Sequence, residues 1–257
     1  MYMLDKVKSY KVSVNSLEVN ANYYEEDIEN IFIPLLKQLK IMKKSKNGKL
    51  LVYLVASPGV GKSTLASFLE FLSKNSENIE EIQAIGIDGF HYHKQYIKNH
   101  KVIIDGREVP MVEVKGCPET FNLGKLKSKI KVLKNESVKW PIYDRKLHDV
   151  VEDQIVVSKE IILIEGNWLL INEDGWRDLK DYCDYSIFIK ANETLLKDRL
   201  IQRKMKGGIS EDEAIKFYEK SDSRNVKRVL NNSLKSDLQL ELLSNGKYKM
   251  GGKFNGN

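Results

Sequence analysis

The segment Ala56-Ser-Pro-Gly-Val-Gly-Lys-Ser63 has residue types and spacing suited to binding a triphosphate. It matches the Walker A pattern, with Ala in the place of the usual first glycine. Gly59 and Gly61 allow backbone N–H groups to converge on phosphate oxygens. Lys62 is expected to reach the β and γ phosphates, and the Ser63 hydroxyl is expected to bind Mg²⁺. We therefore predict ATP and Mg²⁺ as cofactors. The predicted nucleotide-binding residues of this loop are Ser57, Pro58, Gly59, Val60, Gly61, Lys62, Ser63 and Thr64.

Two carboxylates follow apolar runs that are typical of strands. Asp88 comes directly after Ile82–Ile87, and Glu165 ends the run Glu160–Glu165. Because ligands bind at the carboxyl ends of parallel strands, both side chains are expected beside the phosphate loop. This edge of the sheet needs two acidic groups: one coordinates Mg²⁺, directly or through water, and the other accepts a proton from the attacking hydroxyl or orients it. A turn-forming Asp beside glycine is the structural alternative for Asp88.

The segment Asn192–Lys206 is basic and ends at Gly207-Gly208, which suits a helix with a glycine C-cap. Arg199 and Arg203 are four residues apart and therefore share one helix face. Such a helix can close over ATP and neutralise charge on the moving phosphoryl group, so we place a lid at 195–209. Arg203 is the candidate for phosphate contact, together with Lys62 and Asp88 as catalytic residues. Arg199 either stacks on the adenine or bridges structurally, and a solvated basic helix is the alternative to a lid.

Apolar runs that alternate with amphipathic segments must position these groups. Four apolar runs are expected to form buried strands: Leu50–Ala56, Ile82–Ile87, Glu160–Glu165 and Tyr185–Ile189. Leu238–Leu243 is a further candidate strand late in the chain. A helix whose apolar side chains recur at helical spacing follows the phosphate loop. This alternation predicts the α/β class, as a P-loop NTPase three-layer fold with a mostly parallel sheet.

The remaining segments predict smaller elements. Lys11–Ala21 alternates apolar and polar residues about Asn15-Ser16, which predicts a β-hairpin, and a helix follows it. Asp-Gly within Val102–Val109 predicts a second hairpin. Spaced leucines and isoleucines predict a helix over Leu123–Leu133. The segment Lys139–Asp149 is polar and aromatic, and we expect a loop there.

Length and composition limit the function classes. The chain has 257 residues, 42% of them hydrophobic and 30% charged, as in an ordinary globular protein. It shows neither a signal peptide nor a membrane-spanning run, so we expect a cytoplasmic protein without a membrane partner. The net charge is +6, but the lysines are dispersed without interleaved aromatics, so we expect no nucleic-acid partner. Cys117 and Cys183 form no zinc or disulfide pattern.

Several segments together resemble the phosphoribulokinase/uridine kinase/pantothenate kinase group of P-loop kinases. Within this group the chain is most similar to the nucleoside/nucleotide kinase-like branch, which includes the kinase of a fructose transport system. The resemblance covers roughly Val52–Val229. The matching segments are Asp88-Gly-Phe-His91, Lys115-Gly-Cys-Pro-Glu-Thr-Phe121, Trp140-Pro-Ile-Tyr-Asp-Arg145, Leu147-His-Asp149 and Glu165-Gly-Asn-Trp-Leu-Leu170.

The resemblance implies a single P-loop kinase domain over 1–257. Its parts would be an N-terminal hairpin and helix over 1–47 and a kinase core over 48–250, with an acceptor region at 90–149. Asp88 would be the catalytic base, and Glu165 would lie near the Mg²⁺ ion that Ser63 holds. Asp222 and Asn225 would lie near the nucleotide or behind the lid. The residues that would bind the acceptor are His91, Lys115, Glu119, Thr120, Phe121, Tyr143, Arg145 and His148.

The resemblance identifies the acceptor only as a small molecule with a hydroxyl group. Asn122 stands where the family often has Asp, and Val102–Val114 is longer than the usual link; both departures affect the acceptor side. A sugar or sugar phosphate is our first expectation, followed by a nucleoside or pantothenate. Related enzymes are often dimers, which leaves a homodimer open. A non-kinase NTPase switch and a P-loop protein that binds nucleotide without turnover are the alternatives from other classes.

Overall fold

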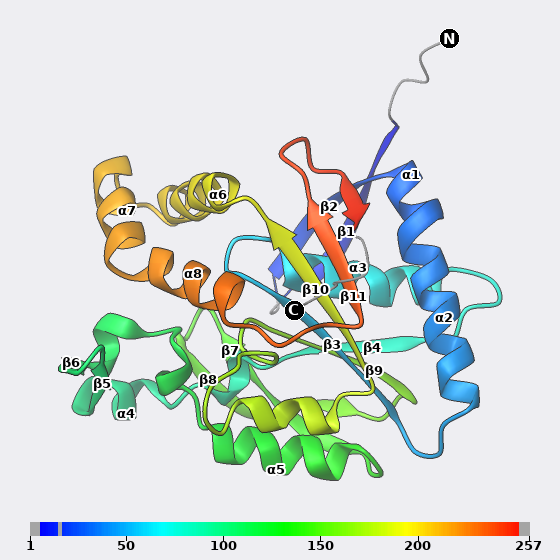
Figure 1. Ribbon diagram of the computed structural model, residues 1–257, viewed down its shortest axis with the longest axis horizontal. Helices are drawn as coiled ribbons and strands as arrows, with labels where there is room; N and C mark the ends of the chain where they lie inside the picture. Colours follow the sequence, from blue (N-terminus) through cyan, green and yellow to red (C-terminus); the bar gives the residue numbers. More distant parts are fainter. Residues whose placement is uncertain (1–5, 15–16, 252–257) are drawn as a thin grey trace.

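The computed structural model describes residues 6–14 and 17–251 and contains a six-stranded central sheet (Figure 1). Its spatial order is β12-β11-β10-β3-β9-β4, and all neighbouring pairs are parallel except the antiparallel pair β11–β12. This arrangement confirms the predicted α/β class with a mostly parallel sheet. The strands are β3 (Leu50–Ala56), β4 (Ile82–Gly86), β9 (Ile161–Gly166), β10 (Tyr185–Ala191), β11 (Leu238–Leu242) and β12 (Tyr248–Met250).

Burial along the strands follows their place in the sheet. Every residue of β3 and β9 is buried, as expected for central strands covered on both faces. The prediction that Ile82–Ile87 is equally buried was wrong, because β4 is an edge strand and Gln83, Ala84 and Gly86 are only half-buried. The exposed flank of β4 is therefore available to line a pocket.

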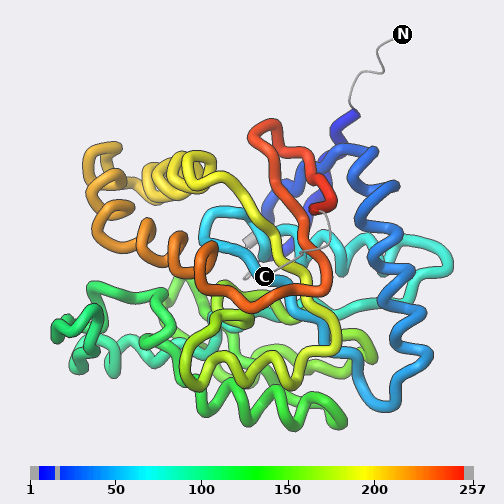
Figure 2. Tube along the Cα trace, viewed as in Figure 1, coloured from blue at the N-terminus to red at the C-terminus, as the bar shows by residue number. Residues whose placement is uncertain are grey.

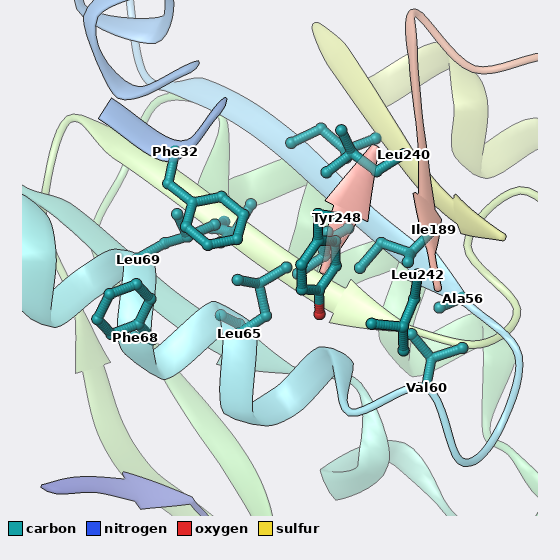
Figure 3. Packing of buried hydrophobic residues seen from close by; sticks show 14 of the residues in the cluster. Phe32, Ala56, Val60, Leu65, Phe68, Leu69, Ile189, Leu240, Leu242 and Tyr248 are labelled. Carbon is teal, nitrogen blue, oxygen red and sulfur yellow. The ribbon is translucent and has the colours of Figure 1, made fainter. Parts of the chain in front are cut away.

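Two apolar cores lie on opposite faces of the sheet. One contains Leu65, Phe68 and Leu69 of α3 (Lys62–Lys74), which pack near Phe32 and Tyr248 (Figure 3). The other lies beneath α5 (Leu123–Leu133) and includes two fully buried tryptophans, Trp140 and Trp168. In Figure 1, α2 (Ile33–Lys44) and α3 lie on one side of the strands and α5 on the other. These helices and the sheet form the predicted three layers.

The N-terminal region forms the predicted hairpin and helix. Strand β1 (Val7–Val14) pairs antiparallel with β2 (Leu17–Tyr24); the proposed turn residues Asn15 and Ser16 lie outside the described residues. The chain continues through α1 (Glu25–Asp27) and a π-helical turn, 28–32, into α2. The hairpin contacts α3, which is the helix that follows the phosphate loop.

The region between β4 and β9 contains two hairpins rather than one. The predicted hairpin is β5 (Lys101–Ile104) with β6 (Arg107–Pro110), and it follows α4 (Lys94–Asn99). The predicted loop at Lys139–Asp149 was wrong: β7 (Val138–Asp144) pairs with β8 (Asp149–Val157). Pro141 sits at a register shift between Trp140 and Ile142, where a strand tolerates the missing N–H.

The C-terminal helices follow the predicted capping signals. Helix α6 (Glu193–Lys206) is capped by the Asn192 side chain and ends at Gly207. The capping box of Ser210 and Glu213 starts α7 (Glu211–Phe217), and a π-helical turn at 218–222 leads into α8 (Ser223–Asn231). Figure 2 shows this segment, from yellow to orange, as a continuous arm beside the sheet. Within the described ranges, no helix combines the length and apolar character needed to cross a bilayer.

Candidate active site

The phosphate loop has the backbone conformation that anion binding requires. Gly59 and Gly61 adopt φ angles of 88° and 98°, a region that residues with a side chain rarely occupy. A Cβ on Gly59 would lie 3.0 Å from the Leu200 side chain, so the loop packs directly on α6. The α3 helix begins at Lys62 and directs its positive end toward the loop. These features fit the triphosphate of ATP.

Three polar side chains converge where β3 and β9 end. The Ser63 hydroxyl donates a hydrogen bond to Glu165 Oε1 at 2.7 Å, and Lys62 Nζ lies 3.7 Å from Glu165 Oε2. Glu165 is buried, and desolvation raises the pKa of its carboxyl, while the Lys62 charge opposes that rise. A hydroxyl and a carboxylate facing each other fit a Mg²⁺ ion that also binds phosphate oxygens.

Asp88 lies at the same edge of the sheet, as its position after β4 predicted. The backbone N–H of Ile87 donates to the Glu165 carbonyl at 3.0 Å, so the ends of the two chain segments are adjacent. A Cβ on Gly89 would lie 2.2 Å from the Pro141 carbonyl oxygen. Only glycine permits this approach, which places the Asp88 turn directly against β7.

A pocket of about 400 Å³ joins these groups. Ser63, Asp88 and Glu165 line one end, and Tyr143 of β7 lies beside them. Lys115 donates a hydrogen bond to the Tyr143 hydroxyl at 2.6 Å and thus lies next to the part of the pocket that Tyr143 lines. The pocket therefore brings a candidate base, the candidate metal ligands and an acceptor-side tyrosine into one space.

His91 lies beside this pocket and is held by two contacts. Its Nδ1 is 2.9 Å from the Asp88 carbonyl oxygen, and its ring centroid is 3.8 Å from that of Phe121. Phe121 itself is almost fully buried and also contacts Trp176. Phe121 thus supports the His91 ring, and its contact with an acceptor remains a prediction.

Two other residues with predicted acceptor roles build the surrounding loops. Thr120 is fully buried, and its hydroxyl donates to the Cys117 carbonyl and accepts from the Gly116 N–H. Glu119 instead forms a two-pronged ion pair with Arg228 of α8, at 2.7 and 3.1 Å. Thus neither side chain lines the pocket that contains Asp88. Arg145 and His148 are exposed in the turn between β7 and β8, where their predicted roles remain predictions.

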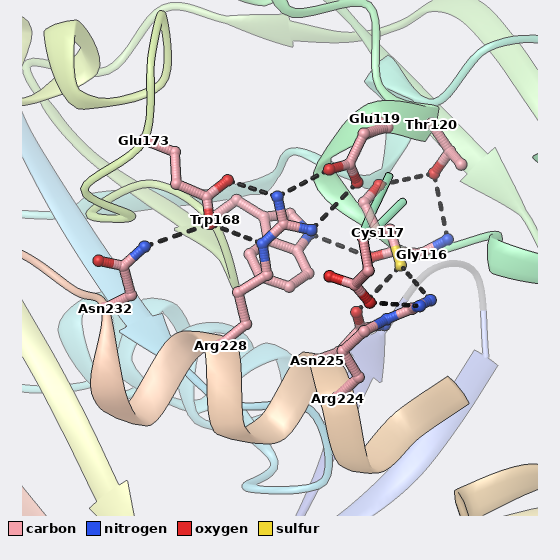
Figure 4. A network of polar contacts seen from close by, with 11 residues as sticks. Gly116, Cys117, Glu119, Thr120, Trp168, Glu173, Arg224, Asn225, Arg228 and Asn232 are labelled. Atoms are coloured by element: carbon pink, nitrogen blue, oxygen red, sulfur yellow. Dashed lines mark hydrogen bonds and ion pairs between the residues drawn. The ribbon is translucent and has the colours of Figure 1, made fainter. Parts of the chain in front are cut away.

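Figure 4 shows the network that holds this acceptor loop against α8. Arg228 also binds Glu173 at 2.6 Å. Burial disfavours the charged guanidinium, but its hydrogen bonds to Glu173 and Glu119 outweigh burial and raise its pKa. The Cys117 thiol donates to Asn225 Oδ1 at 3.1 Å. Sequence reasoning did not find this role for Arg228, because no local pattern links a helix residue to carboxylates more than 50 positions away.

The two lid arginines occupy different positions. Arg199 donates from Nη1 to the carbonyl of Val60 at 2.9 Å, so it supports the phosphate loop, in agreement with the bridging alternative. Arg203 is exposed on α6, and its contact with phosphate remains a prediction. Lys204, next to it, lies over the Phe217 ring. The Ser57 hydroxyl donates to the Val226 carbonyl, which joins the loop to α8.

Sequence reasoning also missed two walls of the pocket. One comes from β7 and β8, through Trp140 and Gln154, and the other from Ser13 and Val14 of the N-terminal hairpin. Trp140 is fully buried and donates from Nε1 to the Gly86 carbonyl at 2.8 Å. The alternation of apolar residues around it was a signal for a strand, but the adjacent proline and aromatic residues favoured a loop.

Comparisons with known proteins identify relatives of this chain. The chain is 38% identical over 239 residues to the "Uncharacterized protein YggC" of Escherichia coli (strain K12), covering 93% of this chain and 97% of that protein. It is 27% identical to the pantothenate kinase of Ligilactobacillus salivarius (strain UCC118), covering 74% of this chain and 66% of the kinase.

A solved structure from Silicibacter sp. TM1040, described as a candidate fructose transport system kinase, aligns with a TM-score of 0.71 and 29% identity. The alignment covers 80% of this chain and 97% of that one. The Phosphoribulokinase / Uridine kinase family matches residues 51–241, which is well over half of the sequence. This match includes the phosphate loop, Asp88 and Glu165, and the chain belongs to the Phosphoribulokinase / Uridine kinase family of P-loop kinases.

Proposed function

We propose that the protein transfers the γ-phosphoryl group of ATP to a hydroxyl of a small metabolite. The observation that carries this proposal is the single pocket in which Asp88 faces the same space as Ser63 and Glu165. A sugar or sugar phosphate is our first choice of acceptor, supported by the likeness to the candidate fructose transport system kinase. A nucleoside or pantothenate is the alternative, and the pantothenate kinase relatives support the latter.

The chain's own residues would perform most of the steps. Asp88 orients the acceptor hydroxyl and takes its proton as the new O–P bond forms, while the bond from the γ-phosphorus to the β,γ-bridging oxygen breaks and ADP leaves. Lys62 and Arg203 neutralise charge on the phosphate oxygens, and closure of the 195–209 lid excludes water. Mg²⁺, held by Ser63 and Glu165, would supply charge neutralisation between the β and γ phosphates.

The test measures ATP consumption across a panel of sugars, sugar phosphates, nucleosides and pantothenate. Asp88→Asn keeps the side-chain shape but removes the base, so we expect kcat to fall about 10²- to 10⁴-fold. Asp153→Asn, at an exposed aspartate of β8, is the matched control and should retain activity. Equal turnover by wild type and Asp88→Asn would refute the assignment of the base.

Other outcomes of the same panel distinguish the remaining classes. A silent panel with ATP hydrolysis stimulated by DNA or RNA would favour an NTPase switch. Nucleotide binding without phosphorylation of any acceptor would favour a P-loop protein without turnover. We also propose that the protein acts in the cytoplasm, without a nucleic-acid or membrane partner; cell fractionation tests the location. A homodimer would be detected by light scattering of the purified protein.

A further inference from the structure

The pocket beside Asp88 has a far half that the proposed chemistry does not use. Ser63, Ser67 and Glu70 of α3 all line the pocket and recur at intervals of four and three residues, which places them on one helix face. Seven residues of α-helix span roughly 10 Å, so the pocket extends about that far from Ser63. This length can accommodate a small metabolite with its reacting hydroxyl beside Asp88.

The N-terminal hairpin closes this far half. Ser13 and Val14, near the described end of β1, line the pocket. Both residues precede residue 51, where the family match begins. The pocket wall that they form therefore lies outside the matched kinase core. The structure therefore places a segment from outside the family match against the space where an acceptor would lie.

Aromatic packing fixes the hairpin on α3. The Tyr10 ring lies 4.8 Å from the Phe68 ring and 5.6 Å from the Phe71 ring. On β2, the Tyr23 ring stacks on Phe68 at 4.4 Å. Helix α3 carries both the Phe68 and Phe71 rings and the pocket-lining Ser67. The hairpin therefore has a defined position over the pocket.

The chemistry of the far half differs from that of the catalytic end. Its polar residues are Ser13, Ser67, Gln83, Gln154 and Glu70. The Gln83 amide is engaged with the backbone of Val156 and Ser158, and the Gln154 amide donates to the Glu152 carbonyl. Among residues 6–14 and 17–251, no lysine or arginine lines the pocket. Lys74 pairs with Glu70 at 2.8 Å and compensates its charge.

Cations instead surround the catalytic end. Lys62 lies 3.7 Å from Glu165, and Lys115 holds the Tyr143 hydroxyl. An anionic group in the far half would lose its hydration without gaining a cation among the lining residues. Uncharged hydroxyl groups can exchange hydrogen bonds with the hydroxyls of Ser13 and Ser67 at much lower cost.

We propose that the far half of the pocket binds an uncharged, hydroxyl-bearing end of the acceptor, with Ser13 and Val14 as specificity-determining residues. This inference rests on the proposed kinase function, because the acceptor is the molecule phosphorylated beside Asp88. It favours an uncharged polyhydroxyl acceptor, such as a free sugar or a nucleoside, over acceptors that already carry a phosphate or carboxylate.

The first experiment separates this inference from the proposed function. The small-molecule fraction of a cell extract is passed over an anion exchanger, and each fraction is incubated with the protein and γ-labelled ATP. Label should enter acceptors of the unretained, uncharged fraction. Label that enters only acceptors of the retained, anionic fraction overturns the inference but leaves the kinase function intact. Label transfer to neither fraction overturns the proposed function and this inference together.

The second experiment tests the hairpin wall. Val14→Trp fills part of the far half and should reduce acceptor phosphorylation about tenfold at limiting acceptor, while ATP affinity stays unchanged. Ser9→Trp, at an exposed position of the same strand, is the control for a bulky ring on the hairpin. Ser67→Ala tests the opposite wall with a change too small to disturb folding. Equal acceptor kinetics in wild type, Val14→Trp and Ser67→Ala would overturn the assignment.

Discussion

The nucleotide side and the acceptor side of the site are built in different ways. The phosphate loop is one continuous segment, Ala56–Ser63, between a buried strand and the helix that follows it. The proposed acceptor side combines the Asp88 turn, the β7–β8 hairpin and residues Ser13 and Val14 of β1, which are distant in sequence. A short motif encodes the backbone geometry that fits phosphate, whereas the proposed acceptor side consists of side chains that only tertiary packing brings together.

This difference predicts that the largest single effects will come from the local nucleotide motif. Lys62→Met removes the cation expected at the β and γ phosphates, and we expect kcat to fall about 10³-fold with a smaller change in ATP affinity. Steady-state kinetics and calorimetric ATP binding measure the two quantities. Lys44→Met, at an exposed lysine near the end of α2, should match wild type. A Lys62→Met enzyme with wild-type kcat would contradict the assigned loop geometry.

The acceptor side should depend more on folding. Arg228→Met leaves the partly buried carboxylates of Glu119 and Glu173 without their shared partner. We expect a loss of about 2–3 kcal/mol in the free energy of unfolding, discounted for the partial exposure of all three side chains. Urea denaturation measures the loss, and Lys227→Met, at an exposed site of the same helix, is the control. A change in stability no larger than that of the control would show that the network of Figure 4 is not stabilising.

The same contrast explains what the sequence could predict. Leu50–Ala56 is a continuous apolar run, and the Gly-Lys-Ser end follows it at once, so strand, loop and helix were all predicted within a few residues. Asp88 and Glu165 were predicted to lie together because parallel strands end at one edge. Asn122, a departure from the family pattern, caps α5 by accepting from the Lys125 N–H, a role its residue type permits.

The unpredicted parts depend on contacts between distant segments. Thr120 was assigned to the acceptor because of its motif, but its burial follows from the loop that packs against α8. Trp140 anchors β7 by donating a hydrogen bond to the Gly86 carbonyl, which lies 54 positions earlier in the sequence. Val14 reaches the pocket only because Tyr10 and Tyr23 pack on α3. No spacing rule in one sequence specifies such contacts.

A smaller effect should separate the acceptor side from the nucleotide side directly. Tyr143→Phe removes the hydroxyl that accepts from Lys115 and leaves the ring in place. We expect the acceptor KM to rise about tenfold, with ATP affinity and stability nearly unchanged. Tyr96→Phe, at an exposed tyrosine of α4, is the control for loss of a hydroxyl. An increase in the ATP KM of Tyr143→Phe, with the acceptor KM unchanged, would show that Tyr143 contributes to the nucleotide side and not to the acceptor side.

The smallest expected effect is a pH dependence of stability that arises at His91. Desolvation lowers the pKa of His91 below its ordinary value of 6.5, against the opposing charge of Asp88. The unfolded chain therefore binds a proton more readily than the folded protein, so this contribution to stability is complete above pH 6.5 and is lost as the pH falls through the lower folded-state pKa.

Thermal unfolding of wild type and His91→Gln between about pH 8 and pH 5 tests this pH dependence, because the variant lacks the titrating ring. The Tm of wild type should fall more steeply below pH 6.5 than that of His91→Gln, whereas His100→Gln, at an exposed histidine, should follow wild type. Parallel curves for wild type and His91→Gln would show that the ring is not desolvated in solution, and the acceptor side would then be more open than its contacts with Phe121 indicate.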